Sequence, residues 1–187
     1  MINRDVLLEW AFGMAESDMD RISIAAIIDG TDSTEIPCEL IEEEEKEVDE
    51  RSVFESIREM SVPQKIKLAL FGNQIARTIL IRDVSNKQIP MMVLNNPRIT
   101  DNEIFEITKN TNIDERVLRE IGNNLSWMKP YAVKFAIVSN PKVPIDISLK
   151  WLKHIRDKDL KILSRSKNIA QTINTQSKKI LETRGKK

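Results

Sequence analysis

The chain has 187 residues, of which 41% are hydrophobic and 31% charged, and only 5 Gly and 7 Pro. This length fits one domain with a real core or a domain plus a tail, and the composition favours helices. No run of about 18 apolar residues is present, which excludes a transmembrane helix by sequence. A single cysteine, Cys38, excludes an internal disulfide, and with one histidine, His154, it cannot make a closed zinc site.

The net charge of zero hides an asymmetry between the two ends of the chain. Residues 1–60 carry 18 Asp and Glu against 5 Lys and Arg, a net charge of −13, and residues 61–187 carry the compensating +13. Such a split suggests two parts with different surfaces. We therefore expect an acidic, partly ordered N-terminal segment, 1–51, and a helical domain, 52–187.

The first 50 residues give mixed signals. Apolar clusters predict a short helix from about Asp5, whereas the run at 22–28 fits a helix or a strand, and an extended conformation is one interpretation of 34–41. The dense acidic run from Glu42 to Glu50 has no apolar stripe to bury, which predicts a mobile linker at about 42–51. The alternative is an acidic arm that folds over the basic half of the chain.

Short helices with recognisable ends are predicted from residue 52 onward. Ser61 precedes Pro63 as a helix N-cap, Gly72 suits the position just past a helix, and Thr100 with Glu103 forms a capping box. Before Pro97, two asparagines are expected to stop a helix, since Asn tolerates the left-handed conformation and the residue before Pro leaves the α region. The predicted helices cover about 52–60, 62–71, 74–81, 88–94, 101–109, a segment from Asp114 to 121, 131–138, 144–155, a segment capped by Asp157, and 169–181.

A motif occurs twice in this helical region. Phe135 to Pro144 has the sequence FAIVSNPKVP, and an earlier copy, MVLNNPRIT, begins at Met92, so the two Asn-Pro pairs lie 44 residues apart. Two helices per 44 residues is a unit length of helical solenoids, in which each unit contacts its neighbours. We therefore predict an all-α fold, an α-solenoid of short HEAT-like repeats. The residues expected to form its joints are Asn96, Pro97, Asn140 and Pro141.

The same motif resembles the signature of leucine-rich-repeat variant units, with Thr100 in place of the usual Pro in the earlier copy. More broadly, 55–181 resembles HEAT-like helical repeat proteins of deltaproteobacterial type. The resemblance rests on MSVPQKIKLALFGN at 60–73, ARTILIRD at 76–83, NPRITDNEI at 96–104 and SWMKPYAVKFAIVSNPKVPIDISLKWL at 126–152. It implies an α-solenoid with an interaction surface. Some repeat-variant proteins hold an N-terminal iron–sulfur cluster through several cysteines, which Cys38 alone cannot do, so no cofactor is expected.

Aromatic and basic side chains after residue 126 are the best candidates for a binding surface. Trp, Tyr and basic residues are enriched at binding hot spots, although large aromatics also fill gaps between repeats. The predicted partner-binding set is Trp127, Lys129, Tyr131, Lys134, Lys150 and Trp151.

No catalytic signature is present. Cys38 lies among acidic residues, which disfavours a reactive thiolate, and His154 has no evident carboxylate partner in the sequence. We therefore predict a non-catalytic cytoplasmic scaffold or adaptor that binds another protein; no secretory signal is visible at the N-terminus. The alternative is nucleic-acid binding by the basic surface of 61–187, held in check by the acidic arm.

Overall fold

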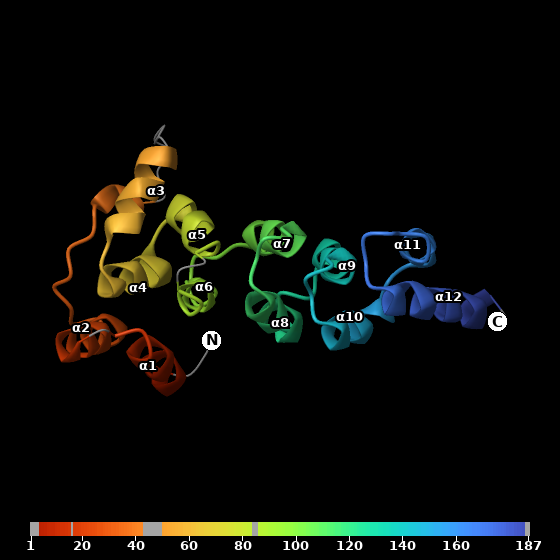
Figure 1. The fold of residues 1–187 in the computed structure, drawn as a ribbon, viewed down its shortest axis with the longest axis horizontal. Helices are drawn as coiled ribbons and strands as arrows, with labels where there is room; N and C mark the ends of the chain where they lie inside the picture. Colours follow the sequence, from red (N-terminus) through yellow and green to blue (C-terminus); the bar gives the residue numbers. More distant parts are fainter. Residues whose placement is uncertain (1–3, 16, 43–49, 84–85, 186–187) are drawn as a thin grey trace. The chain divides into compact units, whose positions relative to one another are not determined.

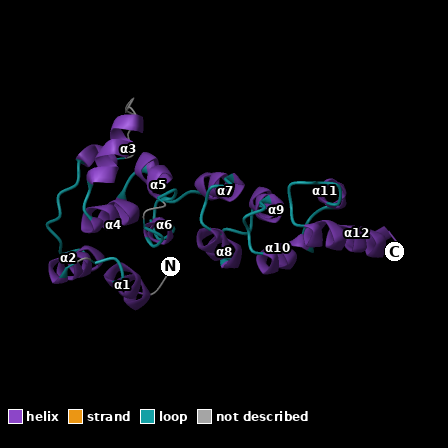
Figure 2. Ribbon diagram, in the orientation of Figure 1, coloured by secondary structure: helices purple, strands orange, loops and turns teal. Residues whose placement is uncertain are grey.

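The computed structural model describes residues 4–15, 17–42, 50–83 and 86–185, and over these ranges it contains helices and loops and no strand (Figures 1 and 2). The all-α prediction is therefore confirmed. The chain divides into two compact units, which we call unit 1, Met1–Ile99, and unit 2, Thr100–Lys187. Each unit is described by itself. None of the helices in the described ranges has the length and apolar character needed to cross a membrane.

Unit 1 contains six α-helices and one short 3-10 helix within its described residues. Their bounds are α1 Arg4–Phe12, α2 Asp18–Asp29, the 3-10 helix η1 Cys38–Leu40, α3 Glu50–Glu59, α4 Val62–Phe71, α5 Gln74–Leu80 and α6 Ile89–Val93. Unit 2 contains another six: α7 Asp101–Lys109, α8 Glu115–Asn123, α9 Tyr131–Ser139, α10 Ile145–Leu152, α11 Asp157–Leu163 and α12 Gln171–Gly185.

The helix starts follow the capping signals in the sequence. Thr100 and Glu103 form the predicted capping box of α7, and Ser61 forms one with Gln64 at the start of α4. The side chain of Asn73 accepts a hydrogen bond from the N–H of Ala76. Because these bonds satisfy N–H groups that a helix cannot pair internally, they fix where each helix begins.

The structure decides one local prediction that the sequence left open and differs from others. The ambiguous run 22–28 is helical and belongs to α2, and the candidate extended stretch 34–41 contains η1. Arg156 is the N-cap of α11, and Asp157 is its first helical residue. Most of the predicted linker, 43–49, lies outside the described residues.

Neither the asparagines before Pro97 nor Gly72 adopts a left-handed conformation where its helix ends. No described residue other than Gly30 has a positive φ, so the asparagines end their helices in another way. Gly72 has an extended conformation, with φ −64° and ψ 160°. It is needed for space, because a Cβ there would lie 2.3 Å from the carbonyl oxygen of Leu68.

In unit 1 the N-terminal helices pack on the helices that follow the acidic run. Helix α2 packs against both α1 and α4, α4 packs against α5 and α6, and α3 packs against α5. The predicted domain boundary between residues 51 and 52 therefore lies inside unit 1. The fully buried side chains of this core include Ile24, Ile27, Ile66, Leu68, Leu80 and Met92.

In unit 2 the helices alternate between two rows. Figure 1 shows α7, α9 and α11 in one row and α8, α10 and α12 in the other, and α7 packs against α9, α8 against α10 and α10 against α12. Helices α7 and α9 begin 30 residues apart, as do α8 and α10. The prediction of two helices per 44 residues is wrong, since α7, α8 and α9 all lie between Asn96 and Asn140. The Asn-Pro pair marks the end of a helix, and its spacing does not measure a helix pair.

Candidate functional site

The two Asn-Pro motifs share a hydrogen-bond geometry. In unit 2 the buried amide of Asn140 donates from Nδ2 to the carbonyl oxygens of Thr108, at 2.8 Å, and Asn110, at 3.1 Å, at the end of α7. Its Oδ1 accepts the backbone N–H of Lys142 at 2.9 Å. The side chain of Asn140 thus stabilises the turn after α9 and caps the C-terminal end of the neighbouring helix α7.

Asn96 does the same in unit 1. Its Nδ2 donates to the carbonyl oxygens of Ala69 and Gly72, both at 3.1 Å, at the end of α4, and its Oδ1 accepts the N–H of Arg98 at 2.9 Å. Helix α4 packs beside α6, the helix that Asn96 follows. Both asparagines therefore satisfy C-terminal carbonyl groups that a helix leaves unpaired.

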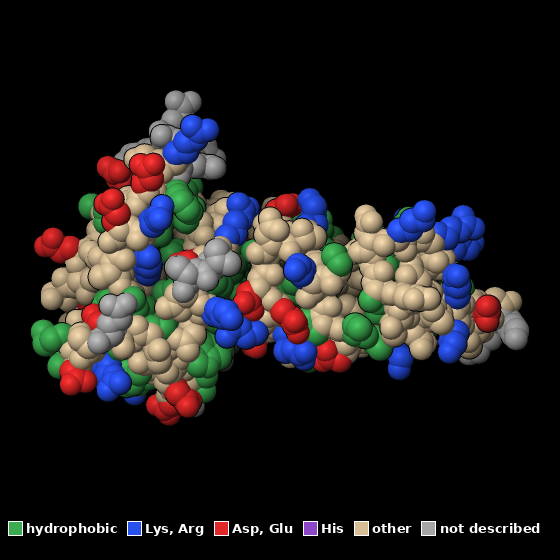
Figure 3. Space-filling model, in the orientation of Figure 1, with side chains coloured by type: hydrophobic (Ala, Val, Ile, Leu, Met, Phe, Trp, Pro, Cys, Tyr) green, Lys and Arg blue, Asp and Glu red, His purple; other side chains and the backbone are tan. Residues whose placement is uncertain are grey.

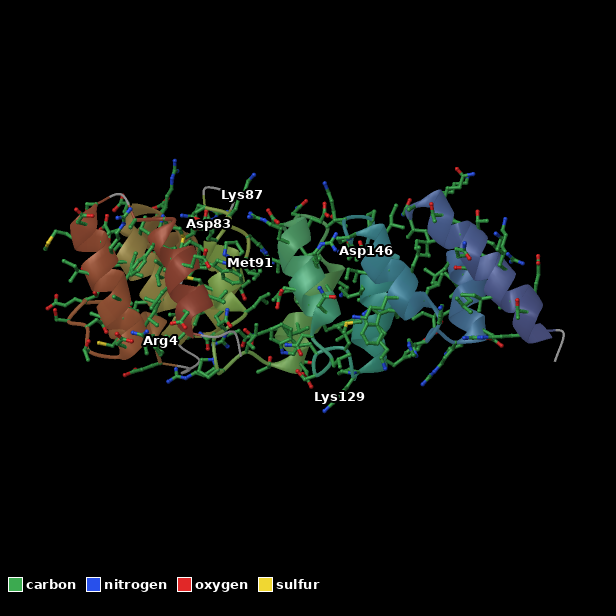
Figure 4. The ribbon with its side chains drawn as sticks, turned by 90° about the horizontal axis from the view of Figure 1, so that it is seen from below. Arg4, Asp83, Lys87, Met91, Lys129 and Asp146 are labelled. Carbon is green, nitrogen blue, oxygen red and sulfur yellow. The ribbon has the colours of Figure 1, made fainter. Side chains whose placement is uncertain are left out.

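Trp127, Lys129 and Lys134 lie around the turn between α8 and α9. Trp127 and Lys134 are half-buried, and Lys129 is exposed. The ammonium group of Lys134 donates to the carbonyl oxygen of Lys129 at 3.1 Å, so the two residues are neighbours. Figure 4 shows Lys129 at the edge of unit 2, directed away from the helices and apart from Asp146.

Tyr131 is engaged with α11. Its hydroxyl donates to a carboxylate oxygen of Asp159 and accepts the backbone N–H of Arg156 at 3.1 Å. The guanidinium of Arg156 lies 4.3 Å from the centre of the tyrosine ring, a distance that suits a cation–π contact. Burial and the hydrogen bond to Asp159 raise the pKa of Tyr131. These contacts hold α9 and α11 together.

Trp151 is part of the core of unit 2. The side chain is 7% exposed, and its Nε1 donates to the carbonyl oxygen of Gly122 at 2.7 Å. Lys150 extends over the indole ring, with Nζ 5.5 Å from the ring centre. A Cβ on Gly122 would lie 2.3 Å from Cγ2 of Ile147, so α8 and α10 approach closely here. Trp151 thus supports the packing of these two helices.

The six predicted partner-binding residues therefore have three different environments. Lys129 and Lys134 line one turn with Trp127, Tyr131 bonds to α11, and Trp151 with Lys150 belongs to α10. Sequence spacing could not separate these environments, because the deciding contacts come from residues 25 to 29 positions away.

A groove in unit 1 was not anticipated from the sequence. It has a volume of about 610 Å³ and is lined by α3, α4, α5 and the turn after α5. Buried Ile57 and Leu80 contribute apolar surface, and Phe54 on α3 is 54% exposed. The other lining residues are Arg51, Glu55, Arg58, Lys65, Ile79, Arg82 and Asp83. Figure 3 shows hydrophobic, Lys or Arg and Asp or Glu side chains together in the region of α3 and α5.

The basic side chains of the groove differ in whether they form hydrogen bonds within the chain. Lys65 donates from Nζ to the carbonyl oxygen of Arg58 at 3.3 Å, near the end of α3. The guanidinium groups of Arg58 and Arg82 have no hydrogen bond or ion pair to the part of the chain that the structure describes. Two arginines thus stand beside apolar surface, a combination found at binding hot spots.

Elsewhere, several basic residues of the predicted basic surface are used internally. Lys67 pairs with Asp32 at 2.8 Å and also donates to the carbonyl oxygen of Thr34, and Arg77 is 2% exposed and donates to Gly72. Burial alone would raise the pKa of Asp32, but the hydrogen bonds from Lys67 and Thr34 outweigh it and lower the pKa.

The basic residues of 153–167 are exposed. Asp157 accepts a hydrogen bond from Arg184 at 2.6 Å, and Asp159 accepts one from Tyr131, so both carboxylates of α11 are engaged within unit 2. The exposed basic residues around them are Lys153, Arg156, Lys158, Lys161, Arg165 and Lys167. We call this set the α11 basic patch; Figure 3 shows Lys and Arg side chains over α11.

Neither the single cysteine nor the single histidine is among the residues that line the groove. Cys38 is exposed in η1, and the imidazole of His154 lies 5.5 Å from the ring of Trp151. Over the described ranges, no three His, Cys, Asp or Glu side chains are arranged to hold a metal ion. In the comparisons with known proteins, no family model, no curated protein and no solved structure matches the chain.

Proposed function

We propose that this chain is a non-catalytic protein-binding module built on HEAT-like helical repeats, and that its contact surface is the groove of unit 1. The alternating rows of unit 2 and the shared asparagine joints support the helical-repeat architecture. Helical repeats commonly present extended surfaces to other proteins.

The observation that carries the proposal is Phe54. The side chain of Phe54 is 54% exposed and lines a concave, partly apolar surface. Its exposed apolar area would contribute favourable free energy if a partner buried it. Covering such a surface stabilises a complex, and aromatic side chains flanked by arginine are frequent anchors of interfaces. We therefore place the proposed binding surface at the groove beside Phe54, and no longer at the turn around Trp127.

A photo-cross-linking amino acid at position 54 tests this function in cells. We expect position 54 to yield a small set of discrete cross-linked proteins, and Arg58→Glu in the same chain to remove them. The matched control is position 162, where Ile162 is 60% exposed in α11 of unit 2. The same cross-linked products from both positions, or none from position 54, would contradict the proposal.

A second candidate function is nucleic-acid binding through the α11 basic patch, and it is favoured by the excess of cations there. Arg184 neutralises Asp157, and the six Lys and Arg of the patch outnumber the remaining carboxylate of α11, Asp159. Phosphate backbones bind such surfaces. The acidic run Glu42–Glu50 would weaken this binding if it competes for the same charges.

Fluorescence anisotropy with a labelled DNA duplex and a labelled RNA strand separates this candidate from the first. We expect affinity to fall steeply with added salt and to drop on Lys158→Glu with Lys161→Glu. Because α2 packs against α4, deletion of residues 1–50 would disturb unit 1. Replacing the glutamates at 43–45 and 47 by Gln is cleaner, and it should raise affinity. Absence of binding at low salt in both chains would eliminate nucleic acid.

A further inference from the structure

We infer that the groove lined by α3, α4 and α5 binds an amphipathic helix whose polar side is acidic, supplied by a partner protein. The inference rests on the proposed function and names the chemistry of its partner. It is drawn from the shape of the groove, its apolar surface and the arginines beside it.

The apolar surface fits the hydrophobic side of a helix. Ile57 and Leu80 are buried residues of α3 and α5 that line the groove, and Phe54 lies one turn before Ile57 on α3. A ligand helix presents anchors at positions i, i+3 or i+4, and i+7, which form a continuous apolar stripe. Such a stripe would cover Phe54 and contact Ile79 and Leu80.

The charges select an acidic polar side. Arg58 and Arg82 lack partners among the described residues, and the ammonium group of Lys65 lies beside the end of α3. The lining holds more cations than carboxylates: its carboxylates are Glu55 and Asp83, and its cations are Arg51, Arg58, Lys65 and Arg82. A guanidinium donates two parallel hydrogen bonds to a carboxylate, so a Glu or Asp next to the apolar stripe can pair with either arginine.

The openness of the groove favours a helix over other ligands. Arg51, Phe54, Glu55, Arg58 and Arg82 are all exposed, so the cavity opens along α3 and does not enclose a small molecule. A strand would need a sheet edge, and the described residues contain no strand. A nucleic-acid backbone would meet Glu55 and Asp83 as well as apolar surface, whereas an acidic helix uses both the apolar and the basic parts.

Designed peptides provide the test. Three labelled peptides of about 16 residues, which is about four helical turns, serve as probes. They are an acidic amphipathic peptide with Leu anchors, the same peptide with Lys in place of every Glu, and a scrambled acidic peptide with the composition of the first. Anisotropy with the full chain should show binding of the acidic amphipathic peptide only, and weaker binding as salt is raised.

Substitutions in the groove should weaken that binding. We expect Phe54→Ala, Arg58→Glu and Arg82→Glu each to reduce affinity about tenfold or more. Ile162→Ala and Lys142→Glu are the matched changes of an exposed apolar and an exposed basic residue in unit 2, and they should leave affinity unchanged. Circular dichroism verifies that each variant keeps the helical content of the parent chain.

Three results would overturn the inference: equal binding of the acidic and scrambled peptides, binding of none of the three, or displacement of the acidic peptide by decanoate, which would mark a site for small amphiphiles. Failure of the peptide with cross-links from position 54 intact would remove this partner class and leave the proposed function standing. Loss of both the peptide binding and the cross-links from position 54 would contradict the inference and the proposed function together.

Discussion

In unit 1 the amide of Asn96 reaches the end of α4, and in unit 2 the amide of Asn140 reaches the end of α7. The two units thus hold adjacent helices with the same side-chain device. They differ in how regularly their helices are arranged and in what their helices leave exposed. Unit 2 follows a regular alternation of rows, whereas in unit 1 the exposed face of α3 presents Phe54 to a groove. The comparison teaches that the repeated motif serves packing, and that the candidate binding surface lies on a helix away from it.

Removing the asparagine joint should have the largest effect, and the effect should be larger in unit 2. We expect Asn140→Ala to lower the free energy of unfolding by about 3 kcal/mol, because the carbonyls of Thr108 and Asn110 receive no other donor among the described residues. Asn96→Ala should cost about 2 kcal/mol, because Arg77 still donates to Gly72 and only the carbonyl of Ala69 is orphaned.

Urea unfolding followed by circular dichroism measures the change in the free energy of unfolding of the whole chain. Hydrogen exchange with mass spectrometry shows which of the two units is destabilised. Asn112→Ala is the matched control, since Asn112 is exposed in the turn before α8. Equal costs at Asn96 and Asn140, or a cost at Asn112 as large as theirs, would refute the account of the joint.

The sequence predicted the helices well because their signals are local. Ser61, Asn73, Thr100 and Asp114 form caps with residues two or three positions away, and such patterns can be recognised without a tertiary structure. The helix stop before Pro97 was predicted at the right place, but its mechanism was not, because the acceptors of the Asn96 amide lie 24 and 27 residues earlier in the chain.

The candidate site was less predictable. Phe54 belongs to the apolar pattern of its helix, and only the arrangement of α3 against α5 shows that its ring stays exposed. Trp151 has the composition of a binding hot spot, yet its indole N–H pairs with Gly122 in the core. Burial of an aromatic residue depends on neighbouring helices, so composition alone cannot distinguish an anchor from a core residue.

The close contact of α8 and α10 predicts the next effect. In Gly122→Ala the added Cβ would meet Cγ2 of Ile147, and overpacking of this kind costs about 2 kcal/mol, which exceeds the gain of about 1 kcal/mol from replacing Gly by Ala in a helix. Thermal unfolding should therefore show a net loss of stability. Ile147→Ala combined with Gly122→Ala should relieve the clash and give a favourable coupling energy. Gly185→Ala, where the Cβ meets open space, should be neutral.

A half-buried ion pair distinguishes unit 1 from the more exposed pairs of unit 2. Asp32 and Lys67 are 10% and 20% exposed, so Lys67→Met should lower stability by about 1.5 kcal/mol at pH 7. The pKa of Asp32 is lowered in the folded state, so this contribution is present above the unfolded pKa and is lost as the pH falls through the folded pKa. The difference between parent and variant should shrink below about pH 4. Lys158→Met, at an exposed lysine of α11, should show neither the loss nor the pH dependence.

The contact between α9 and α11 should give the smallest effect, but it can be followed directly because Tyr131 is the only tyrosine of the chain. Burial and the hydrogen bond to Asp159 raise its pKa, so absorbance at 295 nm should show ionisation above the ordinary value of about 10. Asp159→Asn should lower that pKa, whereas Glu182→Gln, at an exposed carboxylate of α12, should leave it unchanged.

The stability effect of the same bond has a defined sign. Because folding raises the tyrosine pKa, its contribution is complete below the unfolded pKa and is lost as the pH rises through the folded pKa. Asp159→Asn should therefore cost about 1 kcal/mol at pH 7 and progressively less above about pH 10, where an ionised Tyr131 would repel the carboxylate of Asp159. A pKa of Tyr131 at or below 10 in the parent chain would show that the hydroxyl does not bond to Asp159, and the contact of Tyr131 with the start of α11 would then rest on Arg156 alone.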